Sequence, residues 1–133
     1  MTARTAVLTT ASSARLEHLE RQQRFLAREA AHLRVIAWLD AAPPPDLPGA
    51  IVVHVPPGRH GLRVGAGRNA AAAAALEAGA KLLVLLDVDC LPGPDLLRRY
   101  AGASAAHPTA LLCGPVTYLP EGCARSERIR WAR

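Results

Sequence analysis

The chain has 133 residues, half of them apolar, with 27 alanines and only five aromatic side chains. This length suits one domain with one hydrophobic core, and the small side chains indicate that the core buries less apolar area per residue than usual. The formal net charge is +5, but the arginines are spread along the chain and few aromatics could stack on bases, which argues against a nucleic-acid-binding module.

The cysteines and the apolar runs indicate the compartment. Cys90, Cys113 and Cys123 form no close pair and leave an odd one over, so neither a disulfide framework nor a tetrahedral zinc site is indicated. The apolar stretch before Thr9 is too short and too polar for a signal peptide, and no run approaches the roughly 20 residues that span a bilayer. We therefore expect a cytoplasmic protein without a transmembrane segment.

Three strands and one long helix are predicted in the first half of the chain. The predicted strands are residues 5–10, 34–39 and 51–55. Ser12 or Ser13 can cap the helix after the first strand. Its apolar stripe is formed by Leu16, Leu19, Leu26, Ala30 and Leu33. Asp40 ends the second strand and is followed by a proline-rich loop that cannot continue a ladder.

The second half begins with a glycine-rich, basic loop over residues 59–67, and Gly79 is placed to end the alanine-dominated helix that follows. The predicted helices are residues 68–78 and 95–106, and the predicted strands are residues 82–86 and 109–116. The last residues, 120–133, are a basic, irregular tail.

Strands that alternate with helices predict an α/β fold. We expect about five strands in a doubly wound, mostly parallel sheet with helices on both faces, as in Rossmann-like nucleotide-binding folds. The expected domain spans residues 5–119. Ligands of such sheets bind at the carboxyl ends of the strands.

Asp87 and Asp89 directly follow a strand of five apolar residues and precede a proline-rich turn. If the chain stays extended, both carboxylates leave the same face, and one cation could contact both. Carboxylate oxygens suit Mg²⁺ and Mn²⁺, which take one or two of them and fill the other positions with water and phosphate. Asp also occurs at strand ends as a turn former or helix cap, which explains Asp95 better than it explains the pair.

Two segments carry a resemblance to a known family. The Gly-Arg-Asn-Ala sequence of residues 67–70 opens the alanine-rich helix, and the Asp-Val-Asp sequence of residues 87–89 ends the buried strand. They resemble the Ala-Arg-Asn-x-Gly/Ala segment and the Asp-x-Asp strand end of the family-two glycosyltransferases. Those enzymes have the GT-A fold and transfer a sugar from a nucleotide diphosphate donor. The resemblance runs from about residue 5 to residue 119.

The resemblance implies a nucleotide diphosphate sugar as donor and a Mn²⁺ or Mg²⁺ ion as cofactor. The implied nucleotide-binding residues are Thr9, Thr10, Asp40, Arg68, Asn69 and Asp87. The first three match positions that line the base, and Arg68 and Asn69 match positions that contact the nucleotide. Asp87 would contact the ribose or a metal-bound water, and Asp89 would bind the metal. Arg68 also suits phosphate physically, because it stands near a helix start whose free N–H groups favour anions.

The family's acceptor half, which supplies the catalytic base, has no match in residues 115–133. We therefore expect the donor-binding half, able to transfer a glycosyl group to an unknown acceptor if the other half is supplied. A sheet left partly uncovered would favour self-association or a partner chain.

Two other functions fit parts of the sequence. Residues 65–70 fit the Gly-x-Gly-x-x-Ala pattern of NAD(P)-binding Rossmann domains, with Asp87 about twenty residues further on. That fingerprint needs a buried strand leading directly into the first glycine, whereas residues 56–63 are polar and broken by prolines. A folded remnant that binds nucleotide without catalysis is the second alternative.

Overall fold

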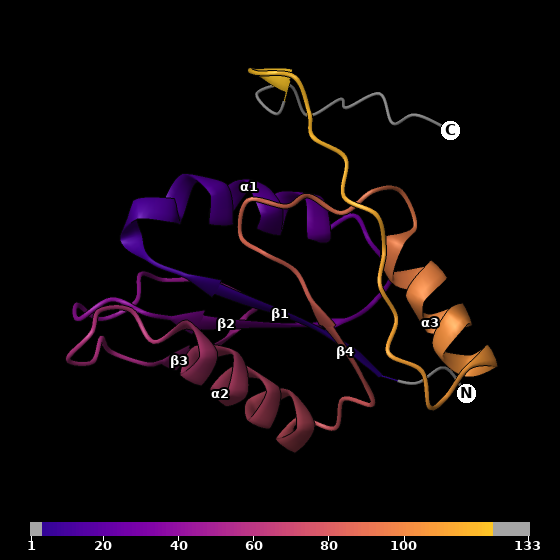
Figure 1. Ribbon diagram of the computed structural model, residues 1–133, viewed down its shortest axis with the longest axis horizontal. Helices are drawn as coiled ribbons and strands as arrows, with labels where there is room; N and C mark the ends of the chain where they lie inside the picture. Colours follow the sequence, from indigo (N-terminus) through magenta and orange to yellow (C-terminus); the bar gives the residue numbers. More distant parts are fainter. Residues whose placement is uncertain (1–3, 124–133) are drawn as a thin grey trace.

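The structure is a computed structural model that describes residues 4–123 (Figure 1). In chain order its elements are β1 (Thr5–Ala11), the short 3-10 helix η1 (Ser13–Arg15), α1 (Leu16–Leu26), β2 (Leu33–Trp38), β3 (Ile51–His54), α2 (Val64–Glu77), β4 (Leu82–Leu85) and α3 (Leu96–Ala106). Within residues 4–123, none of the helices has the length and apolar character needed to cross a membrane.

The strands form one parallel sheet in the order β3-β2-β1-β4. β1 lies inside the sheet, and Ala6, Val7 and Leu8 are at most 4% exposed because both faces of this strand are covered. A near-continuous apolar run is typical of such a strand. Parallel pairing also brings the carboxyl ends of all four strands to the same edge of the sheet.

Helices cover both faces of the sheet, as predicted (Figure 1). α2 packs on one face, where the small side chains of Ala71 and Ala75 lie against the core residues of β1 and β2. α1 packs on the other face, where Leu19 lies against Ile36 and Leu26 lies near Val7. α3 covers β4 on that same face through its one buried residue, Leu97. The α/β, doubly wound architecture is therefore confirmed.

The predicted fifth strand at residues 109–116 is wrong. Residues 107–123 are irregular, and the described sheet has four strands. Two prolines, Pro108 and Pro115, have no N–H for a ladder, and Leu111 is 94% exposed, so neither hydrogen bonds nor burial stabilises a strand here. The segment passes α3 instead, where a Cβ on Gly114 would lie 2.7 Å from the Tyr100 hydroxyl.

Several element boundaries differ from the predicted ones. α2 begins at Val64, four residues before the predicted start, so Gly65 and Gly67 are helical. α1 ends at Leu26, and residues 27–32 form turns before β2. Asp95 precedes α3 in a left-handed conformation without a side-chain capping bond. Residues 124–133 of the predicted tail lie outside the described part of the chain.

Candidate functional site

The candidate site is the carboxyl edge of the sheet. β1, β2, β3 and β4 all end there, and the loop after β3 leads into the N-terminus of α2 at the same edge. The residues predicted from the sequence stand at or just beyond these ends. Open α/β sheets bind their ligands in this position.

The turn after β4 carries both aspartates. The Leu86 N–H still donates to the Leu8 carbonyl of β1, at 3.0 Å. The chain then turns, and the Cys90 N–H donates to the Asp87 carbonyl at 2.9 Å. The segment from Asp87 to Asp89 is thus not extended, so the expected same-face geometry does not hold. Both side chains are nevertheless exposed on one tight turn.

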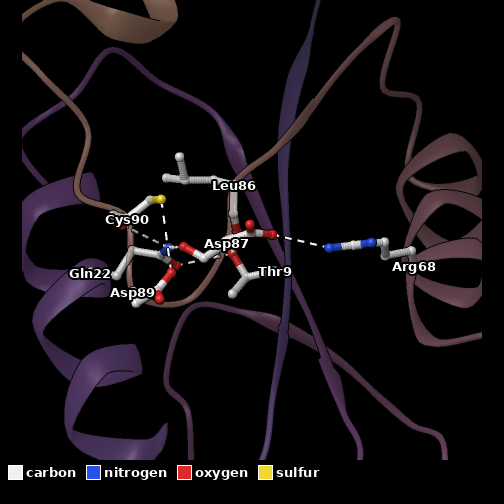
Figure 2. Close-up of polar contacts among 7 residues, drawn as sticks. All are labelled: Thr9, Gln22, Arg68, Leu86, Asp87, Asp89 and Cys90. Atoms are coloured by element: carbon white, nitrogen blue, oxygen red, sulfur yellow. Dashed lines mark hydrogen bonds and ion pairs between the residues drawn. The ribbon is translucent and has the colours of Figure 1, made fainter. Parts of the chain in front are cut away.

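Arg68 and Asp87 form an ion pair across the edge. The Arg68 Nη2 atom lies 3.1 Å from Asp87 Oδ1, and the two side chains are 47% and 68% exposed. Figure 2 shows the Asp87 side chain reaching toward Arg68 on α2, while Asp89 lies beside Cys90 on the far side of the turn. This contact joins the two sequence motifs that are 19 residues apart.

Cys90 lies half-buried next to Asp89. Its Sγ donates to Asp89 Oδ1 over 3.9 Å. Burial raises the pKa of the Cys90 thiol, and the negative charges of Asp89 and Asp87 raise it further, because each disfavours a thiolate. A neutral thiol is a poor nucleophile, so Cys90 suits a packing role.

Sequence reasoning missed Gln22, which anchors this turn from α1. Gln22 is fully buried, and its amide nitrogen donates to the carbonyls of Asp87 at 2.7 Å and Cys90 at 3.1 Å (Figure 2). The available signal was a polar residue on the apolar stripe of a helix, three residues after Leu19 and four before Leu26.

Asp40 lies beyond the end of β2 beside η1. Its carboxylate accepts the backbone N–H of Ser13, and its carbonyl accepts a hydrogen bond from His54 Nε2 at 2.7 Å. Ser13, Trp38 and Asp40 line an open hollow of about 450 Å³ together with residues of the proline-rich loop. The walls of this hollow are mostly apolar, and the predicted role of Asp40 beside a nucleotide base stays a prediction.

Thr9 and Thr10 point to opposite faces of β1. Thr9 is only 3% exposed, and its hydroxyl lies 3.0 Å from Gln22 Oε1 and 3.1 Å from the Leu86 carbonyl. Thr10 faces α2, and it lines a small hollow with Arg68 and Asp87. Asn69 is exposed beside Arg68. The nucleotide-binding roles of these residues stay predictions.

Asp87 and Asp89 offer the oxygen ligands that a divalent cation prefers. Within residues 4–123, no cluster of three or more His, Cys, Asp or Glu side chains is placed to hold a metal. Mg²⁺ and Mn²⁺ need only one or two carboxylates when phosphate and water fill the remaining positions. A single carboxylate is enough for such an ion, and Asp89 is the more available ligand because Asp87 is paired with Arg68.

Comparisons of the chain with protein-family models, with curated proteins and with solved structures found no match. A doubly wound α/β fold hosts many unrelated functions. The residues at the carboxyl edge are therefore the basis for a functional proposal.

Proposed function

We propose that this chain binds a nucleotide diphosphate sugar at the carboxyl edge of the sheet, together with Mn²⁺ or Mg²⁺. The observation that carries the proposal is the 3.1 Å contact between Arg68 and Asp87. It brings the Gly-Arg-Asn-Ala and Asp-Val-Asp segments together at the one edge where a parallel sheet binds ligands. The family that these segments resemble uses both for a nucleotide sugar.

The residues of this edge supply complementary charges. Arg68 is an exposed guanidinium in the second turn of α2, and the free N–H groups of the first turn also favour an anion. Both features suit a diphosphate. Asp89 and Asp87 suit the cation, and the hollow beside Asp40 suits the base. A bound divalent cation would offset the negative charge of the departing nucleoside diphosphate.

We propose glycosyl transfer only for this chain together with an acceptor-binding half. The acceptor itself is not identified. The same edge would serve a chain that binds the nucleotide without transferring sugar. A cytoplasmic location also belongs to the proposal, because Cys90, Cys113 and Cys123 are all free thiols.

The geometry gives less support to NAD(P) binding. Gly65 and Gly67 both lie inside α2, ten residues or more after the end of β3. The dinucleotide fingerprint instead requires a glycine turn directly between a strand and its helix. The short connection from β1 to α1, over residues 12–15, contains no glycine.

Calorimetric titration with UDP, GDP and NAD, each with and without Mn²⁺, tests the proposal. We expect a nucleoside diphosphate to bind in a metal-dependent manner, and Asp89→Ala to abolish that dependence. If the nucleotide affinity changes neither when Mn²⁺ is left out nor in Asp89→Ala, the proposed metal site is wrong. NAD binding without metal would support the dinucleotide alternative.

A further inference from the structure

We infer that Gln22 is a positioning residue that holds the turn bearing Asp87 and Asp89 in the geometry that metal binding requires. The inference rests on the proposed metal-dependent nucleotide site. Gln22 lies in α1 and is 0% exposed. A buried amide must find its hydrogen bonds inside the protein, so the identity of its partners shows what the side chain does.

The Gln22 amide spans the turn from end to end. Nε2 has two N–H groups, and it donates to the Asp87 carbonyl at 2.7 Å and to the Cys90 carbonyl at 3.1 Å. Oε1 faces the Thr9 hydroxyl of β1 at 3.0 Å. Carbonyl groups only accept, so the amide nitrogen must face the turn and the amide oxygen must face the hydroxyl.

These bonds tie together three segments that are far apart in the sequence. Residue 22 is 65 positions from Asp87 and 13 from Thr9. The backbone of the turn itself contributes the bond from Cys90 N–H to the Asp87 carbonyl. Gln22 therefore links the turn to α1 and, through Thr9, to the buried strand β1 (Figure 2).

The chemistry of the side chain indicates a role beyond packing. An unbranched apolar side chain such as Met could fill the same volume, but it would leave the Cys90 carbonyl without the Gln22 donor. A cation site needs its carboxylates at defined positions, and groups outside the ligand set commonly supply that order. Gln22 is well placed for this task because it donates hydrogen bonds to the carbonyls of Asp87 and Cys90, which lie on either side of Asp89 in the turn.

The matched variants Gln22→Met and Gln23→Met test the inference. Gln23 is the next residue of α1, and its Oε1 accepts from Arg34 Nη1 at 3.1 Å. Its Nε2 also donates to Gln22 Oε1 at 3.4 Å, so Gln23→Met removes one contact of the Gln22 amide oxygen but leaves both Gln22 bonds to the turn. The first measurement is the rate of hydrogen exchange at the Cys90 amide, relative to the rate at the Ala75 amide in α2. The second is the affinity of the folded protein for Mn²⁺ with UDP or GDP, at a temperature well below unfolding.

In Gln22→Met we expect the Cys90 amide to exchange about ten-fold faster or more, as its hydrogen-bonded turn opens more often. We also expect Mn²⁺ affinity to fall by about 10- to 100-fold. Gln23→Met should change neither. If Gln22→Met does not fold, Thr9→Val removes the hydroxyl that faces Gln22 Oε1 and should shift both quantities in the same direction by less.

Three results would overturn the inference. Unchanged exchange in Gln22→Met would show that Gln22 does not hold the turn, whatever the protein binds. Faster exchange with unchanged Mn²⁺ affinity would leave Gln22 a structural residue only. A native chain that binds neither Mn²⁺ nor a nucleoside diphosphate would refute the proposed function, and the exchange data would still show whether Gln22 orders the turn.

Discussion

At the scale of single residues, the ion pair between Arg68 and Asp87 contributes little to the stability of the fold. Both are about half exposed or more, and solvent screens such pairs. The proposed role of Arg68 in nucleotide binding can therefore be tested without a large loss of stability.

We expect Arg68→Gln to change the free energy of unfolding by less than about 1 kcal/mol. Nucleoside diphosphate binding should weaken by about 1.5–3 kcal/mol, because one charge-assisted contact is lost. Arg98→Gln is the matched control, since Arg98 pairs with Asp95 at 3.2 Å at the start of α3 and both side chains are exposed. Chemical denaturation and calorimetric titration measure the two effects. Equal affinities for the two variants would refute the role of Arg68.

The pKa of the Cys90 thiol depends on the charges of the neighbouring aspartates. Burial raises the pKa of its thiol, and Asp89 and Asp87 raise it further. Asp89→Asn should therefore lower the pKa of Cys90, so that at mildly alkaline pH a larger fraction is thiolate and alkylation is faster. The rate of iodoacetamide modification against pH measures this, with the exposed Cys113 as internal reference. A pH profile that does not move would show that Asp89 has no electrostatic influence on the thiol.

At the scale of elements, the position of α2 depends on how closely it approaches the sheet. Gly67 is buried at the helix face, and a Cβ there would lie 2.6 Å from Leu39 Cδ2. Gly65 lies in the same helix with no atom within 4 Å of such a Cβ. The close approach at Gly67 keeps Arg68, the next residue, above the carboxyl edge.

Gly67→Ala and Gly65→Ala should therefore have opposite effects. We expect Gly67→Ala to destabilise the protein by about 1–3 kcal/mol, because Leu39 must move to admit the methyl group. Gly65→Ala should be neutral or stabilising by up to about 1 kcal/mol, since alanine is the better helix former. Thermal and denaturant unfolding of both variants provides the test. Equal stabilities would contradict the close packing at Gly67.

Most elements were predictable because their signals are local. Apolar runs and turn residues predicted β1 to β4, and apolar periodicity predicted α1. The apolar sequence of residues 109–116 predicted a strand that does not form, because no neighbouring strand supplies hydrogen bonds or burial there. The glycines at the start of α2 were read as a loop, since local propensity does not register the packing that stabilises them in a helix.

At the scale of the whole molecule, β4 is the last strand at one edge of the described sheet, and several large apolar side chains are exposed. Leu85 is 59% exposed, while Val116 and Tyr118 are 71% and 94% exposed. Unpaired strand edges and exposed apolar side chains both favour association. Self-association or a partner chain stays a prediction, which solution measurements test.

We expect the purified chain to associate as its concentration rises, and Leu85→Lys to reduce that association by placing a charge next to the open edge. Light scattering across a concentration series measures the effect, with Leu76→Lys on α2 as a control at a similarly exposed leucine. A monodisperse monomer that binds no apolar dye would contradict the prediction.

The sequence by itself determined the α/β class, the succession of elements up to α3, and the two segments that suggest a nucleotide site. These follow from patterns within a few residues, which local chemistry dictates. Only the tertiary structure decided that β4 pairs with β1, that Arg68 forms an ion pair with Asp87, and that Gln22 donates to the Asp87 carbonyl 65 residues away. Such contacts join distant parts of the chain, and they depend on how closely whole elements pack, which no local pattern encodes.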